Sequence, residues 1–235
     1  MIRPTHRDVA TLGVLMLLLS LALANEARSE TRDEGALWLV NQVEMPIDDR
    51  FGVHLMVQNR WVDDVETYER TVVRPWLSFL ATDRVELALG YDAHEFENPN
   101  DSLENRAWQR IAYRHPVGPG SLFTHFWLEE RFFDDSDSVA WRGRFQVGGS
   151  LPLPADFDWT LRNEFFFNLN DTPVIRRTGL RENHLYTGFG HPLGESFRIE
   201  AGYLMQYRDI RGIDLFDHTF VLGLSARTPA LLDLF

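Results

Sequence analysis

Apolar and polar residues alternate with a period of two along most of the chain after residue 35. In residues 51–61 one side of the pattern consists of Phe51, Val53, Leu55, Val57 and Trp61, and the other of Gly52, His54, Met56, Gln58 and Arg60. The same alternation recurs in residues 84–92 and 198–208. Successive side chains of a strand point to opposite faces, so the pattern predicts β-strands with one apolar and one polar face.

Eleven segments carry this pattern, and most of them are ten to thirteen residues long: 36–45, 51–61, 70–80, 84–93, 104–114, 121–133, 139–150, 158–168, 182–190, 197–208 and 218–227. A tilted strand needs about 9–11 residues to cross a bilayer, whereas strands of soluble proteins average roughly 5–6. Tight turns rich in Pro and Gly alternate with longer polar loops, as they do in outer-membrane barrels. We therefore expect an all-β, antiparallel transmembrane β-barrel of about 10–12 strands, with short periplasmic turns and longer acidic outer loops.

The beginning of the chain predicts secretion. Arg3 and Arg7 give it a basic start, and residues 12–24 are an uninterrupted run of apolar and small residues. These thirteen residues are too few to span a bilayer as a helix, and Ala22-Leu23-Ala24 has the form of a signal-peptide cleavage site. An uncleaved anchor is the alternative. We expect export to the bacterial outer membrane, with a cleaved signal peptide at 1–24, an N-terminal tail at 25–35 and a barrel domain at 36–235.

The composition excludes several classes of protein. There is no Cys, which rules out disulfide scaffolds, thiolate metal sites, cysteine nucleophiles and a lipid-anchored cysteine. A mean hydropathy of -0.25 is too polar for a bundle of membrane helices. The 23 cationic residues are all Arg and stand against 35 acidic ones, and the net charge of -12 argues against a nucleic-acid partner.

Aromatic residues make up 13% of the chain, which is high for a protein of this polarity. An outer-membrane barrel explains the excess, because amphipathic rings form girdles at the two membrane boundaries. The candidates are Trp61, Tyr91, Trp141 and Tyr207 near the longer loops, and Tyr113 and Trp159 near the tight turns. A soluble β-sandwich would bury the same alternating faces and is the alternative fold.

The negative charge gathers in the predicted outer loops. Without residues 1–24 the net charge is -13, and a total of -10 belongs to residues 62–69, 94–103, 134–138, 169–181 and 209–217. The predicted strands are therefore close to charge balance. This distribution indicates a sided membrane protein with an acidic outer rim.

Five strings of residues resemble strands of one bacterial family. They are Glu104-Asn105-Arg106-Ala107-Trp108-Gln109, Leu128-Glu129-Glu130-Arg131-Phe132, Trp141-Arg142-Gly143-Arg144-Phe145, Asn163-Glu164-Phe165-Phe166-Phe167-Asn168 and Arg198-Ile199-Glu200-Ala201-Gly202-Tyr203-Leu204. Over residues 36–227 the chain is similar to a family of small outer-membrane β-barrels described only as a domain of unknown function. His184 stands where the family pattern has Arg. The resemblance implies a barrel and no particular activity.

If the apolar faces contact lipid, the charged residues of the opposite faces line the lumen. A charge near the bilayer midplane costs about 2–4 kcal/mol, so these residues must point inward. The candidate lumen-lining or pore-lining residues are Arg60, Arg84, Glu86, Arg106, Arg110, Glu129, Arg131, Arg142, Arg144, Arg162, Glu164, Arg198 and Glu200. Arg pairs with carboxylates in two-bond geometry, which predicts a structural barrel with a rigid, charge-paired lumen. The alternative is a narrow channel whose arginines favour anions.

The sequence gives little support for catalysis. A barrel-embedded lipid hydrolase or acyltransferase needs a Ser activated by a His, but no Gly-x-Ser-x-Gly motif occurs and no motif pairs Ser78 or Ser225 with a His. A site assembled across strands leaves no such signature, so the enzyme hypothesis stays open. Residues 134–138 offer oxygen ligands but lack the Gly and the closing Glu of a calcium loop. We assign no catalytic, cofactor-binding or metal-binding residue.

The expected partners follow from the predicted location. They are outer-membrane lipid and lipopolysaccharide and, during biogenesis, the barrel-assembly machinery, whose recognition signal the terminal Phe235 resembles. We expect a monomer.

The odd number of predicted strands conflicts with the even number found in single-chain bacterial barrels. Three explanations are open: residues 26–35 thread the lumen, 36–45 is not a full wall strand, or one strand escapes the pattern.

Overall fold

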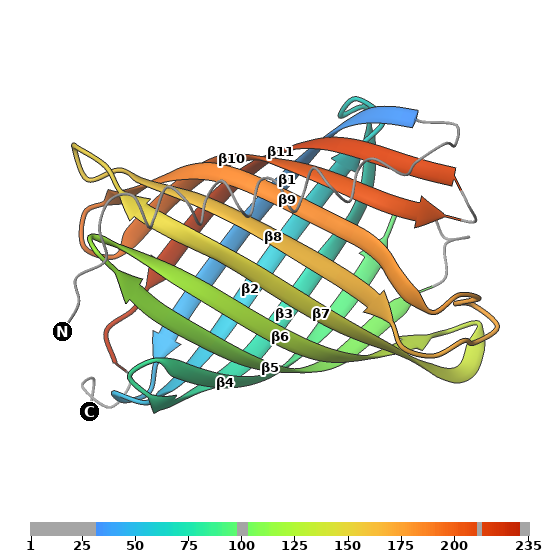
Figure 1. The fold of residues 1–235 in the computed structure, drawn as a ribbon, viewed down its shortest axis with the longest axis horizontal. Helices are drawn as coiled ribbons and strands as arrows, with labels where there is room; N and C mark the ends of the chain where they lie inside the picture. The colour runs from blue at the N-terminus through green and yellow to red at the C-terminus, as the bar shows by residue number, and fades with distance from the viewer. Residues whose placement is uncertain (1–31, 98–102, 211–212, 231–235) are drawn as a thin grey trace.

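A computed structural model describes residues 32–97, 103–210 and 213–230, so the predicted signal peptide lies outside the described residues. Within them the chain forms eleven β-strands (Figure 1). Among these residues, no helix is long and apolar enough to cross a membrane. The strands are β1 (Arg32–Pro46), β2 (Phe51–Val62), β3 (Thr67–Thr82), β4 (Val85–Phe96), β5 (Glu104–Val117), β6 (Gly120–Phe133), β7 (Ser136–Pro152), β8 (Asp158–Asn168), β9 (Gly179–Leu193), β10 (Phe197–Ile210) and β11 (Ile213–Arg227).

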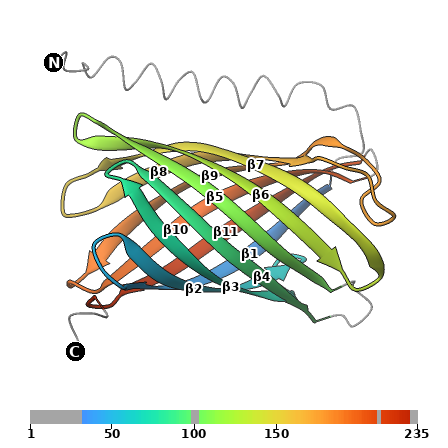
Figure 2. The ribbon, with the colours of Figure 1, turned by 90° about the horizontal axis from the view of Figure 1, so that it is seen from below.

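The strands close into a single barrel, which confirms the predicted fold class (Figures 1 and 2). Each strand pairs antiparallel with the next, and β1 closes the ring by pairing parallel with β11, from Arg32↔Leu215 to Glu44↔Arg227. A parallel closing pair is the geometric consequence of an odd strand number, because the first and last strands then run in the same direction. The segment 36–45 is thus a full wall strand, which answers the strand-number question.

The two ends of the barrel differ in their connections. At the end that we call the turn end, the connections are residues 47–50, 83–84, 118–119, 153–157 and 194–196. At the opposite end, the loop end, the connections of more than four residues are 97–103 and 169–178. Strands of 11 to 17 residues extend into the segments expected as loops, including 134–138. The alternation stops where outward residues become polar, but the backbone ladder continues past that point, so the pattern underestimates strand length.

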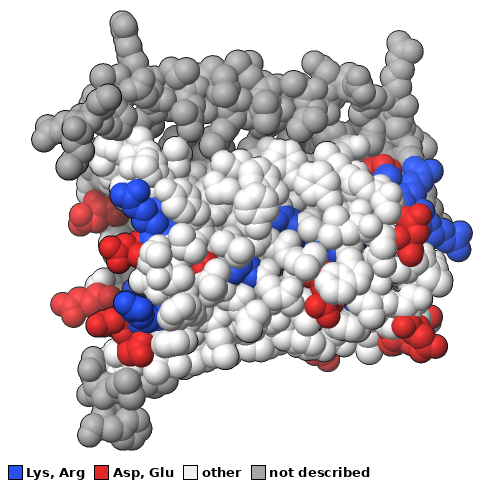
Figure 3. Space-filling view, turned by 60° about the horizontal axis from the view of Figure 1, so that its bottom comes forward, with Lys and Arg blue, Asp and Glu red and all other residues white. Residues whose placement is uncertain are grey.

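Side chains alternate between the outside of the barrel and its interior as the sequence pattern predicts. On β4 the outward Leu89 is 62% exposed, whereas the neighbouring Ala88 is buried. On β3 the outward Leu77 is exposed and Val72 is completely buried. Figure 3 shows charged side chains gathered mainly at the two ends of the molecule, with a largely uncharged band between them.

Apolar residues also pack inside the barrel. One interior cluster joins Met56, Val72, Trp76, Ala88 and Trp108, and a second joins Trp38, Tyr186, Leu204 and Val221. Val40 packs against both clusters, so the apolar contacts continue across the closing strand β1. The interior is therefore a packed core over part of its height.

Two large interior rings lie close to the wall because glycines face them. A Cβ added at Gly90 would lie 2.1 Å from Trp108 Cζ2, and one added at Gly202 would lie 2.4 Å from the Tyr186 hydroxyl. Real Cβ atoms do not approach this closely, so only glycine leaves room for these rings. Gly90 and Gly202 therefore determine the positions of the Trp108 and Tyr186 rings.

Candidate functional site

Most of the predicted lining residues meet inside the barrel as ion pairs. Glu129 on β6 is the centre of the largest group and is completely buried. Arg142 Nε lies 2.6 Å from its Oε2, and Arg144 Nη1 lies 2.7 Å from its Oε1. Arg144 also donates from Nε to Glu164 Oε1 at 2.8 Å, which extends the group to β8. One carboxylate thus holds two arginines of the neighbouring strand.

Glu182 and His184 of β9 continue this group. Glu182 Oε1 lies 2.6 Å from His184 Nε2, and its Oε2 lies 3.8 Å from Arg142 Nη1. Phe166 packs under the two arginines, with its ring centroid 5.0 Å from Arg142 Cζ and 4.9 Å from Arg144 Cζ. Ionic contacts and cation–π contacts therefore act together in this group.

A second group surrounds Asp92, which is also completely buried. Arg74 forms a two-bond pair with it, donating from Nε to Oδ1 at 2.7 Å and from Nη2 to Oδ2 at 2.5 Å. The indole N–H of Trp108 donates to the same Oδ1 at 2.7 Å. Three strands, β3 to β5, are joined through this carboxylate.

A third group lies at the loop end around Glu104, the first residue of β5. Arg106 Nε donates to Oε1 at 2.6 Å, Arg106 Nη2 donates to Oε2 at 2.9 Å, and Arg131 Nε reaches Oε1 at 2.5 Å. Both arginines therefore share one carboxylate. Glu104 on β5 thus binds two arginines, as Glu129 does on β6.

The ion pairs nearer the turn end are more exposed. Arg198 and Asp158 form a two-bond pair at 2.5 and 2.6 Å, whereas Arg162 Nη1 lies 3.9 Å from Glu200 Oε1. Tyr186 donates a hydrogen bond to the same Glu200. Arg110 pairs with Glu86.

The interior ion pairs differ in how exposed their side chains are. In the half nearer the loop end, the side chains of Glu129, Arg142 and Arg144 are 0%, 7% and 10% exposed. In the turn half, those of Arg162 and Arg198 are 35% and 36% exposed. The ion pairs of Arg162 and Arg198 are therefore more accessible than the group around Glu129.

Two of the predicted lining residues have other environments. Arg60 stacks its guanidinium 3.9 Å above the Trp38 ring and donates from Nη2 to Gln58 Oε1 at 2.8 Å. Arg84 lies in the tight turn between β3 and β4 and is exposed. Neither belongs to the ion-pair groups described above.

Sequence reasoning missed the aromatic part of this interior. Trp38, Trp76, Trp108 and Trp127 point inward, whereas the sequence pattern predicts tryptophans only at the membrane boundaries. A signal was present for Trp108, because it lies two residues from both Arg106 and Arg110 and so shares their face. The roles of Glu182 and Tyr186 follow from the same rule once β9 is placed in the wall.

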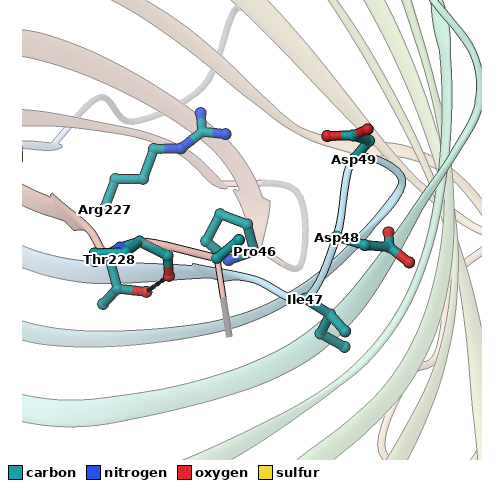
Figure 4. Close-up of a pocket in the computed structure, with 8 residues that line it drawn as sticks. Pro46, Ile47, Asp48, Asp49, Arg227 and Thr228 are labelled. Atoms are coloured by element: carbon teal, nitrogen blue, oxygen red, sulfur yellow. Dashed lines mark hydrogen bonds between the residues drawn. The ribbon is translucent and has the colours of Figure 1, made fainter. Parts of the chain in front are cut away.

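A separate pocket of about 570 Å³ lies at the turn end, at the seam between β1 and β11. Figure 4 shows that Asp48 and Asp49 come from the first turn and Arg227 and Thr228 from the end of β11. The pocket includes none of the predicted lining residues.

Among the described residues, no group of three or more His, Asp or Glu is placed to hold a metal ion.

These features define a closed β-barrel with a charge-paired interior. The chain belongs to the family DUF2490, proteins of unknown function, whose sequence model matches residues 35–216. Among solved structures, an anion-selective porin from Comamonas acidovorans is similar with 10% sequence identity and a TM-score of 0.39, over 70% of this chain and 47% of the porin. The chain thus spans about half the length of that porin. No curated protein matches the sequence.

Proposed function

We propose that the protein is a structural outer-membrane β-barrel whose interior is closed to ions. The apolar outer band supports insertion in a membrane, because a closed barrel leaves no unpaired strand edge and tolerates lipid on its outer face. Outward Leu89, Ile111 and Phe126 are 54–62% exposed, which would be costly in water over so large a surface. In the proposed orientation the turn end faces the periplasm and the acidic loop end faces outward.

Proposed location and partners have a direct test. Fractionation of cells is expected to place the protein with the outer membrane, and the unboiled protein is expected to migrate as a compact species whose mobility changes on heating. The proposed partners are outer-membrane lipid and lipopolysaccharide and the assembly machinery that inserts the barrel. Recovery of the protein in the soluble fraction, with mobility unaffected by heating, would contradict membrane insertion.

The main support for a closed interior is the burial of two charged residues. Glu129 and Asp92 lie on the inner face of the barrel and are completely buried. A water-filled pore would leave such side chains accessible. Their partners come from neighbouring strands, and the apolar clusters around Trp38 and Trp108 add further packed side chains to the interior. A charge-paired plug of this kind blocks the path of an ion in the loop half.

Conductance in planar bilayers tests this proposal. We expect the wild-type barrel to remain silent over repeated reconstitutions. Glu129→Gln is expected to produce conductance steps, because it removes the negative charge that holds Arg142 and Arg144 together and leaves them to repel each other. Glu86→Gln is the matched control: Glu86 also pairs with an arginine, but its side chain is 34% exposed in the turn half.

The channel alternative predicts the opposite result for the wild-type protein. Discrete steps from the unmodified barrel would overturn the closed interior. Anion selectivity that is reduced by Arg142→Glu would then identify a channel lined by arginines. Silence in both variants would show that Glu129 does not hold the plug closed.

A further inference from the structure

Three neighbouring strands carry a carboxylate, an imidazole and a hydroxyl at adjacent register positions in the turn half of the barrel. His54 Nε2 on β2 lies 2.8 Å from Ser78 Oγ on β3. On the other side, His54 is the register partner of Glu44 on β1. The two hydrogen-bonded residues are 24 positions apart in the sequence, so no local sequence motif predicts the pair.

The imidazole of His54 is held in one orientation. Its ring stacks on Trp76 at a centroid distance of 4.6 Å and an interplanar angle of 2°. His54 Nδ1 is buried and has no hydrogen-bond partner, although buried polar atoms are normally paired. In the structure the Glu44 carboxylate contacts Arg227 at 3.3 Å, and the positioning role proposed below requires its side chain to turn toward His54 Nδ1.

Small residues flank the hydroxyl of Ser78. Its register partners are Gly52 on β2 and Ala88 on β4. A Cβ added at Gly52 would lie 3.0 Å from His54 Nε2 and 3.1 Å from Ser78 Oγ, so glycine keeps a side chain away from both atoms. Arg110 is in register with Ala88 on the next strand, and its buried Nε–H has no hydrogen-bond partner.

The geometry points to a serine nucleophile at Ser78 that acts on a small carboxylic ester entering from the turn end. His54 is its general base, Glu44 is a positioning residue, and Arg110 supplies positive charge for the oxyanion. Ser78 Oγ attacks the ester carbonyl carbon while its proton passes to His54 Nε2. The alkoxide then leaves with that proton, and water releases the acid from Ser78 by the same route. This inference is independent of whether the barrel conducts.

Labelling with a fluorophosphonate probe tests the nucleophile in the folded, full-length barrel. We expect peptide mass spectrometry to find the adduct on Ser78, and we expect Ser78→Ala to abolish it. His54→Gln should slow labelling by about a hundredfold, because a general base contributes roughly 10²–10⁴ to such a reaction. Ser225→Ala is the matched control, since Ser225 lies on the inner face of β11 without a role in the site.

Two measurements keep the result unambiguous. Heat-modifiable gel mobility establishes that each variant is folded, and hydrolysis of p-nitrophenyl acetate by the wild-type barrel is expected to fall with Glu44→Gln through kcat rather than KM. No adduct on the wild-type protein, or equal labelling of the His54→Gln variant, would overturn the proposal. An adduct on a different serine would do the same.

Discussion

At the scale of single residues, the interior carboxylates are distinguished by what surrounds them. Asp92 accepts three hydrogen bonds from Arg74 and Trp108 and is completely buried, whereas the side chain of Asp158 is 24% exposed. Removing a charge from water costs several kcal/mol, and only well-formed hydrogen bonds offset that cost. The buried groups are therefore the places where loss of one partner is most damaging.

This difference predicts unequal effects of two similar substitutions. Asp92→Ala leaves the Arg74 guanidinium and the Trp108 indole without their acceptor inside the barrel, and should lower the free energy of unfolding by about 3–5 kcal/mol. Asp158→Ala breaks a pair that is 24–36% exposed and should cost less than about 1 kcal/mol. Urea unfolding in lipid vesicles, followed by tryptophan fluorescence, measures both. Equal losses would mean that exposure does not govern these pairs.

The face on which each of these residues lies could be predicted, but its partner could not. Parity alone puts Glu129 inside, because the side-chain period of a strand is two and any register shift by one residue would turn the apolar face inward. The pairing of Glu129 with Arg142 depends on the register between β6 and β7, which alternation leaves free in steps of two. The His54–Ser78 contact was missed for the same reason.

At the scale of the element, the first tight turn shows how a short connection is held. Asp48 Oδ1 accepts hydrogen bonds from the backbone N–H groups of Arg50 and Phe51, both at 2.7 Å. These bonds favour the ionised form and hold the pKa of Asp48 below its usual range. Asp49, the next residue, is part of the same turn.

The Asp48 bonds predict a pH-dependent effect. Because its pKa is lower in the folded chain, the carboxylate stabilises the barrel above the unfolded pKa of about 4, and this stabilisation is lost as pH falls through the folded pKa. Asp48→Ala should therefore lower the melting temperature at pH 7 and have little effect near the acid end of the transition. Asp49→Ala serves as the control at both pH values. A constant difference between wild type and Asp48→Ala across the range would contradict an ionic origin.

At the scale of the whole molecule, the pairing of β1 with β11 closes the barrel, and the sequence pattern does not predict this pairing. Eleven segments show the alternation, which predicts about 10–12 strands, but the pattern contains no information about whether the first segment pairs with the last. In the structure β1 contributes Trp38 to the cluster of β9, β10 and β11, and Val40 to both interior clusters. Burial of these side chains favours β1 in the wall, because a barrel closed without it would lose the link between the two apolar clusters.

An engineered disulfide tests this closure, and the natural absence of Cys makes the result easy to interpret. Leu39 and Leu222 are register partners on the outer faces of β1 and β11, so the double variant Leu39→Cys/Leu222→Cys should form a cross-link on mild oxidation of the folded barrel. Leu39→Cys/Ala226→Cys is the control, since Ala226 is in register with Val43 instead. Cross-linking of the control alone would show that the register between β1 and β11 differs by four residues from the one in the structure. Cross-linking of neither pair would remove β1 from its place beside β11 and with it the parallel closure of an odd-stranded wall.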